Sequence, residues 1–138
     1  MKNIVLANRS ATICFLSDTI EGVYHDKPIA DITPYPLAPG SELLQDLGFI
    51  GFSLPGVTVT LPHKKPQGRK LTEAQKAENR AISRRRVRIE HIICAVKRCA
   101  ILKEDLRLRA DHIRDTVMEI CCALHNLRLR FNPWKPLT

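Results

Sequence analysis

Aromatic residues are scarce in this sequence of 138 residues, since four Phe, two Tyr and one Trp make up only 5% of it. Long apolar runs are also missing, and none approaches the roughly 20 residues that span a membrane. The N-terminal Met1-Lys-Asn-Ile lacks the apolar stretch of a secretory signal peptide. These absences exclude membrane partners, so we expect a cytoplasmic protein.

Paired cysteines are missing as well. The odd number of cysteines and the lack of a Cys-x-x-Cys pair predict small buried apolar residues in a reducing compartment, at Cys14, Cys94, Cys99, Cys121 and Cys122. Cys121 and His125 share a helical face and could form half of a zinc site. Because the sequence offers no convincing second half, we do not expect zinc.

Acidic residues are outnumbered, and the imbalance is confined to one half of the chain. Residues 1–63 carry three basic and six acidic residues, so their net charge is 3 − 6 = −3. Residues 64–138 carry 22 − 3 = 19 basic and 14 − 6 = 8 acidic residues, so their net charge is 19 − 8 = +11. Such a split favours a polyanionic partner, nucleic acid first of all, although an ordinary basic protein stays an alternative.

The N-terminal half predicts short strands. Residues 3–7 and 11–17 form a hairpin, which must join a larger sheet because two strands alone are marginal in water. A short helix at residues 25–31 follows, with Asp26 as its N-cap. Residues 42–46 predict a brief strand, and residues 57–61 predict the clearest strand of the chain. A basic loop spans residues 62–68.

The C-terminal half predicts two helices. Thr72 and Gln75 form a capping box that opens a helix reaching about Leu102. The apolar face of this helix holds Ile82, Ile89, Ile93, Val96 and Ala100. After a break at residues 104–110, Asp111 caps a second helix, which Asn132-Pro133 ends. Its apolar stripe predicts core packing and consists of Ile113, Val117, Ile120, Leu124, Leu127 and Phe131. Strands followed by helices favour an α/β fold.

Two carboxylates suit metal-dependent phosphodiester chemistry. Such chemistry needs hard oxygen ligands on rigid elements, holding two divalent ions about 4 Å apart. Asp46 lies at the end of a predicted strand and Glu90 lies in mid-helix, and we expect their carboxylates within about 8 Å of each other. Each also has a simpler interpretation, since Asp46 precedes a turn at Gly48 and Glu90 shares a solvated stripe with Arg86 and Lys97.

Two motifs carry a resemblance to a known family. Asp46-Leu-Gly-Phe49 matches the Asp-x-Gly-aromatic motif of bacterial insertion-sequence transposases, and Arg86-x3-Glu90-x6-Lys97 matches their Arg-x3-Glu-x6-Lys signature. From about residue 3 to 131 the chain resembles the catalytic part of the insertion-sequence-five type, which is similar to the Harbinger-like DDE endonucleases. Flanking phrases agree, at residues 23–26, 62–66, 79–80, 84–88 and 124–128.

The resemblance implies a ribonuclease-H-like mixed α/β fold over residues 1–131, followed by a tail at 132–138. It makes Asp46 the second and Glu90 the third acid of the DDE triad, both as ligands of Mg²⁺ or Mn²⁺, with two divalent ions in the complete site. Arg86 and Lys97 would contact DNA near the scissile phosphate. The reaction implied is hydrolysis at the ends of a mobile element and then strand transfer, with no small-molecule substrate.

The basic half adds further predicted DNA contacts, namely Arg84, Arg85, Arg88, Lys64 and Lys65. When bound to DNA, the protein would lie on the nucleoid.

Two departures from the family pattern bear on activity. Ser83 stands where the family has Tyr, and the family's first catalytic Asp lies on a strand before the region that matches Lys2 and Asn3. We therefore expect an N-terminally truncated domain that is inactive alone and pairs with the upstream segment or with a full-length transposase. The alternative is a non-catalytic DNA-binding remnant that assembles with a full transposase.

Overall fold

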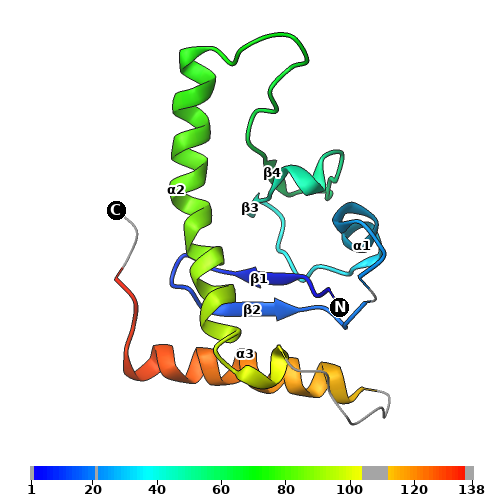
Figure 1. The fold of residues 1–138 in the computed structure, drawn as a ribbon, viewed down its shortest axis with the longest axis vertical. Coiled ribbons are helices and arrows are strands. Elements are labelled where there is room, and N and C mark those ends of the chain that lie inside the picture. Colours follow the sequence, from blue (N-terminus) through cyan, green and yellow to red (C-terminus); the bar gives the residue numbers. More distant parts are fainter. Residues whose placement is uncertain (1, 21, 104–111, 136–138) are drawn as a thin grey trace. The chain divides into compact units, whose positions relative to one another are not determined.

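A computed structural model describes residues 2–20, 22–103 and 112–135 (Figure 1). In these residues the chain forms two short sheets and three α-helices, which confirms the predicted mixed α/β class. The chain divides into two compact units. We call Met1–Gly22 with Arg88–Thr138 the terminal unit, and Val23–Val87 the middle unit. No helix of the described residues is both long and apolar enough to cross a membrane.

The terminal unit contains the predicted hairpin. Strands β1 (Val5–Ala7) and β2 (Ile13–Leu16) are antiparallel, and their register shifts between Leu6 and Ala7. The turn closes through the Ala11 N–H, which donates to the Asn8 carbonyl at 3.0 Å. The Asn8 side chain accepts from the N–H groups of Ser10 and Thr12, both at 3.0 Å. The Asn8 side chain thus stabilises a turn that contains no glycine, as in an Asx turn.

Helices support this hairpin. In the described residues it forms a two-stranded sheet without the additional strands that its sequence predicts. Helix α3 (Ile113–Phe131) lies along it (Figure 1), and the shared core holds Ala11, Ile13, Ile92, Val96, Cys121, Cys122 and Leu129. Asn126 fixes the edge of β2, because its side chain accepts from the Ile13 N–H and donates to the Ile13 carbonyl, each at 2.9 Å. Packing against helices stabilises a hairpin that would be marginal alone.

The buried face of α3 differs from the predicted one. Cys121, Cys122, His125 and Leu129 are 4–7% exposed, whereas four members of the predicted core stripe face solvent, namely Ile120, Leu124, Leu127 and Phe131. Ile113 and Val117 are half-buried. The prediction was wrong because this helix has two apolar faces, and small residues with a histidine fill the one that meets the hairpin.

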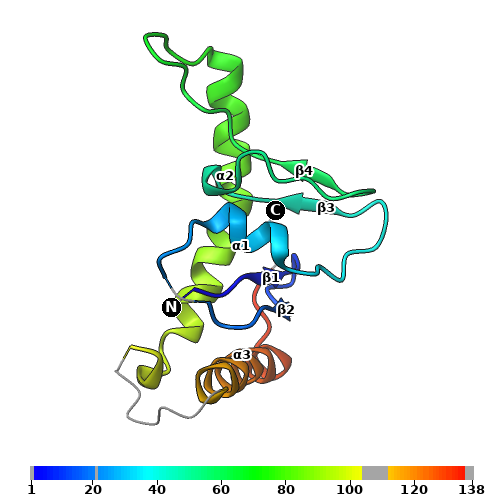
Figure 2. The same ribbon diagram turned by 90° about the vertical axis from the view of Figure 1, so that its right-hand side faces the viewer.

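The middle unit begins with helix α1 (Asp26–Ile32), whose N-cap is His25, so the prediction of Asp26 as N-cap was wrong by one residue. Strands β3 (Glu42–Leu44) and β4 (Thr58–Thr60) then pair in parallel, side by side in Figure 2. The buried apolar residues of this unit are few among those described: Ile29, Ala30, Leu43 and Phe52. The ring of Tyr35 meets Phe52 edge-on at 5.4 Å.

Helix α2 (Glu73–Val96) begins as predicted. The Thr72 N–H donates to the Gln75 side chain at 3.0 Å, and the Gln75 N–H donates to the Thr72 hydroxyl at 3.2 Å, which confirms the capping box. The helix ends at Val96, earlier than predicted, and a 3-10 turn, η2 (Ala100–Leu102), follows. Asp111 and the predicted break at 104–110 lie outside the described residues.

The apolar face of α2 was predicted only in part. Val96 is 3% exposed, but Ile92 and not Ile93 is its buried companion, with exposed fractions of 1% and 39%. Ala100 lies beyond the helix and is exposed. Because Ile89 and Val96 belong to both the predicted and the observed face, the buried face is rotated by less than one residue, toward Ile92.

Candidate nuclease site

Asp46 lies at the turn that follows β3. It is the N-cap of a 3-10 turn, η1 (Leu47–Phe49), and its Oδ1 accepts from the Leu47 N–H at 2.6 Å. Its side chain is 57% exposed. A carboxylate just beyond a strand, held by a capping bond and open to solvent, suits a ligand or catalytic role and equally suits a turn.

The glycine of the Asp-x-Gly-aromatic motif has a steric reason in this unit. A Cβ on Gly48 would lie 3.0 Å from Oδ2 of Asp26, the first residue of α1. The missing side chain thus lets the Asp26 carboxylate approach the turn that carries Asp46. The sequence predicts Asp26 as a helix N-cap within a matched flanking phrase, and this contact places it against the Asp46 turn.

Arginines of α2 bind the two acids of the β3 region. An Nη2 of Arg86 lies 3.1 Å from Oδ2 of Asp46. Arg85 makes a two-pronged contact with Glu42 on β3, at 3.0 and 2.9 Å, and this hydrogen bonding raises the pKa of the arginine. The family motifs containing Asp46 and Arg86 are 40 residues apart in sequence and meet in one ion pair. Glu42 carries no sequence signal that would predict its role.

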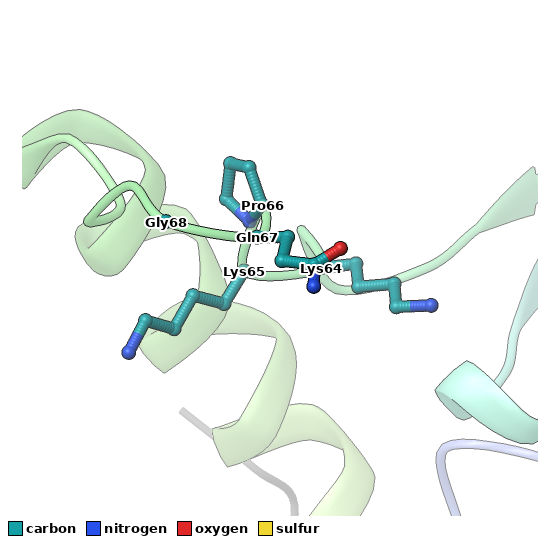
Figure 3. Close-up of a pocket in the computed structure, with 5 residues that line it drawn as sticks. All are labelled: Lys64, Lys65, Pro66, Gln67 and Gly68. Carbon is teal, nitrogen blue, oxygen red and sulfur yellow. The ribbon is translucent and has the colours of Figure 1, made fainter.

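The remaining predicted cations of the middle unit form no ion pair with any residue that the structure describes: Arg84 on α2, and Lys64 and Lys65 on the loop after β4. All three are exposed. In Figure 3 the two lysine side chains extend in different directions from the loop, which borders an open hollow of about 580 Å³ with Pro66, Gln67 and Gly68. They are therefore available to phosphate.

The base of this basic loop is anchored to α2. The His63 N–H donates to the Asn79 side chain at 2.7 Å, and the same side chain donates back to the His63 carbonyl at 3.1 Å. The His63 ring also contacts Glu78. Two residues of the matched flanking phrases, His63 and Asn79, thus hold the start of the lysine-bearing loop against α2.

Three further predicted residues lie in the terminal unit. The Arg88 guanidinium donates to the Lys135 carbonyl and lies 5.5 Å from the centre of the Trp134 ring. This contact, which the sequence does not signal, ties Arg88 to the C-terminal segment. Glu90 on α2 and Lys97, one residue past its end, are exposed. Lys97 forms no ion pair with the described residues.

The predicted distance between the two carboxylates stays a prediction, because Asp46 belongs to the middle unit and Glu90 to the terminal unit. Both Asp46 oxygens already have partners, Leu47 and Arg86. Throughout residues 2–20, 22–103 and 112–135, no three His, Cys, Asp or Glu side chains gather where they could hold a metal ion. We therefore derive no catalytic step through a metal ion.

Comparison with known proteins gives one match. The family model of the DDE superfamily endonucleases matches residues 1–126. No curated protein and no solved structure matches the chain. Endonucleases of this superfamily act on DNA and generally use divalent metal ions. With 126 of its 138 residues inside the match, the chain belongs to the DDE superfamily endonuclease family.

Proposed function

We propose that this chain is the catalytic part of a transposase of the insertion-sequence-five type, a Harbinger-like DDE endonuclease that cleaves the ends of a mobile element and joins them to target DNA. The observation that carries the proposal is the Asp46–Arg86 ion pair of 3.1 Å, because it joins two motifs of that family in one unit. Family membership supports the nuclease chemistry. The two motifs in the sequence favour the transposase type.

In this proposal Asp46 and Glu90 are the second and third acids of the triad. Arg86 orients the Asp46 carboxylate through their ion pair of 3.1 Å. Arg86 and Lys97 also contact the phosphate that is cleaved. Mg²⁺ or Mn²⁺ is part of the proposal, with the remaining ligands supplied by a further acid, by DNA or by both.

The decisive experiment measures nicking and strand transfer on DNA that carries the ends of the element, with Mg²⁺ or Mn²⁺. We expect no activity from the 138 residues alone and activity once a segment with a further family acid is joined to them. Asp46→Asn or Glu90→Gln should then abolish cleavage. Asp31→Asn is the matched control, because Asp31 is an acid of the same unit that pairs with Lys27 at 2.6 Å.

If the joined protein cleaves equally well with Asp46→Asn and Glu90→Gln, the assignment of the two acids is wrong. Robust cleavage by the 138 residues alone, lost in Glu90→Gln, would show that another acid of this chain completes the site. Asp26 is the first to test, because its carboxylate lies against the turn of Asp46.

A second candidate function is DNA binding without catalysis, acting alone or with a full transposase. The exposed cations Arg84, Lys64 and Lys65, which form no ion pair with the described residues, favour it. Duplex DNA binding that persists while the joined protein shows no cleavage would select this candidate.

DNA binding itself tests the basic surface. Affinity for duplex DNA should fall steeply with salt as counterions are released, with little sequence preference. Arg84→Ala should flatten the slope of log affinity against log salt by about one unit, since one phosphate contact is lost. Arg85→Ala, which removes a guanidinium already bound to Glu42, should flatten it less.

The lysines of the basic loop have their own control. Lys64→Ala and Lys65→Ala should weaken binding, whereas Lys76→Ala should change it little, because Lys76 already pairs with Glu73 at 2.7 Å. An affinity that ignores salt would show that these cations are merely solvated.

A further inference from the structure

Helix α3 carries an apolar face that nothing in the described chain covers. Its buried face packs on the hairpin, but Ile120, Leu124, Leu127 and Phe131 are 53%, 51%, 47% and 82% exposed. At 3.6 residues per turn these four side chains fall within an arc of about 60°, on the far side of the helix from Cys122 and Leu129. We call them the outer stripe. A contiguous exposed apolar stripe marks an interaction surface.

The spacing within the outer stripe points to a copy of itself. Its steps of four, three and four residues read the same from either end. Two such helices laid antiparallel about a two-fold axis therefore bring Ile120 opposite Phe131, and Leu124 opposite Leu127. Every stripe residue then meets a stripe residue of the other copy, as an isologous contact requires. Steps of three and four are also the seam of closely packed helix pairs.

Charges beside the outer stripe select the same arrangement. Glu119 and Arg130 are exposed, form no ion pair with the described residues, and lie on the same flank of α3 because eleven residues make about three turns. In the antiparallel register Glu119 of one copy lies two residues, or about 3 Å along the axis, from Arg130 of the other. The two-fold axis produces this pair twice. In a parallel pair Glu119 of one copy and Arg130 of the other would lie about 16 Å apart along the axis, so this ion pair could not form.

We propose that α3 is a self-association surface, and that it pairs antiparallel with α3 of a second copy of this chain through the outer stripe and two Glu119–Arg130 ion pairs. Four side chains per copy cover much less than the approximately 800 Å² that each partner buries in a standard interface. The dimer is therefore reversible and forms as the protein concentration rises.

Sedimentation of the 138-residue chain over a wide concentration range tests the proposal. The mass should rise from that of one 15.6 kDa chain toward twice this value. Leu124→Glu should hold the chain at the monomer mass at every concentration. Because Leu124 is half exposed, the variant should keep the helical circular dichroism of the parent.

Charge reversal tests the direction of pairing. Glu119→Arg alone, or Arg130→Glu alone, should weaken the dimer by roughly tenfold, because each change converts two attractive pairs into two repulsive ones. The double variant should restore it. Arg128→Glu is the control, since Arg128 lies on the opposite flank and should leave the dimer nearly unchanged.

Two results would overturn the proposal. One is a chain that stays monomeric at all concentrations, which includes the case in which another part of the chain covers the outer stripe. The other is a dimer that tolerates Leu124→Glu or that the double charge reversal does not restore, because its contact then lies elsewhere.

Discussion

The two units use their polar side chains in different ways. In the terminal unit, polar groups bind backbone and complete the fold: Asn126 brackets Ile13, the His125 ring contacts the Ala11 carbonyl at 2.9 Å, and Asp115 accepts from the Thr19 N–H at 2.7 Å. The middle unit has such contacts as well, but it also holds several ion pairs, among them Arg85 with Glu42 and Arg86 with Asp46.

The residues that stabilise the fold and the candidate site residues lie mainly in different units. The terminal unit has a continuous apolar core, whereas the middle unit buries few apolar residues among those described. The exposed cations Arg84, Lys64 and Lys65, and the acid at the β3 turn, lie on the middle unit. Residues that hold the fold and residues that meet a ligand are therefore largely different, so mutations should divide into those that unfold the protein and those that spare it.

The largest loss should come from Ile92→Ala. Ile92 is the largest fully buried side chain among the described residues, at 1% exposure. Its truncation leaves a cavity between α2, the hairpin and α3, and should cost about 2–5 kcal/mol in the free energy of unfolding. Urea titration followed by circular dichroism measures it. Ile93→Ala, at a neighbouring position with 39% exposure, should cost clearly less; equal losses would mean that the core is not where we place it.

A smaller loss should come from Asn126→Ala. The change leaves the N–H and carbonyl of Ile13 without their side-chain partner, and an unsatisfied part-buried group costs about 1–3 kcal/mol. The same urea titration measures the change. Arg128→Ala, two residues along on the exposed side of α3, should stay within about 0.5 kcal/mol. A neutral Asn126→Ala would show that water replaces the side chain.

The sequence predicted local structure better than it predicted burial. The capping box of Thr72 and Gln75, the hairpin of residues 3–17 and the strand at residues 57–61 all depend on neighbouring residues, and all three are present. The order of strands and helices was enough to give the α/β class.

The buried face of α3 could not be predicted, because burial depends on which element packs against each face of a helix. The face of α3 with the larger side chains was the natural choice for the core, yet Cys121, Cys122 and His125 meet the hairpin. Small residues allow β2 to approach closely, and His125 is buried because it has a backbone partner at Ala11. Neither condition is visible in the periodicity of one helix.

In the candidate site, too, the sequence predicted some residues and missed the contacts between distant ones. The motifs identified Asp46 and Arg86, whose ion pair the structure contains. The contacts of Arg85 with Glu42 and of Arg88 with Trp134 join residues more than 40 positions apart, so no local pattern predicts them. Exposed charges at such distances can pair in many ways, and the fold selects one.

The two units should lose stability at different alkaline pH values. Burial raises the pKa of Cys121 from 9.0 to about 11 and also raises that of Cys122. A group with a raised folded pKa stabilises the fold fully below its unfolded pKa, and this contribution is lost as pH rises toward the folded value. The terminal unit should therefore lose stability between about pH 9 and 11. Burial raises the pKa of Tyr35 to about 12, so the corresponding loss in the middle unit begins only near pH 10.

Trp134, the single tryptophan, reports on the terminal unit. Urea titration followed by its fluorescence at pH 8 and pH 10 should show the loss. Cys121→Ala should lower stability at pH 8. It should reduce the further loss at pH 10, because the unfolded chain then has one thiol fewer that can ionise. An unchanged pH dependence in this variant would assign the loss to other groups, lysines among them.

The smallest effect should belong to the pair of Arg85 and Glu42. Its two-pronged geometry, at 3.0 and 2.9 Å, is favourable, but the side chains are 43% and 39% exposed. Water and salt screen such a pair, so its coupling energy should be about 0.2–1 kcal/mol. Arg85→Ala, Glu42→Ala and the double variant form a double-mutant cycle, with unfolding free energies measured at low and at high salt. The coupling should shrink at high salt because the charges are accessible to ions. A salt-insensitive coupling above about 2 kcal/mol would exceed the range for exposed pairs, and would show that charges hold the middle unit together as the apolar core holds the terminal one.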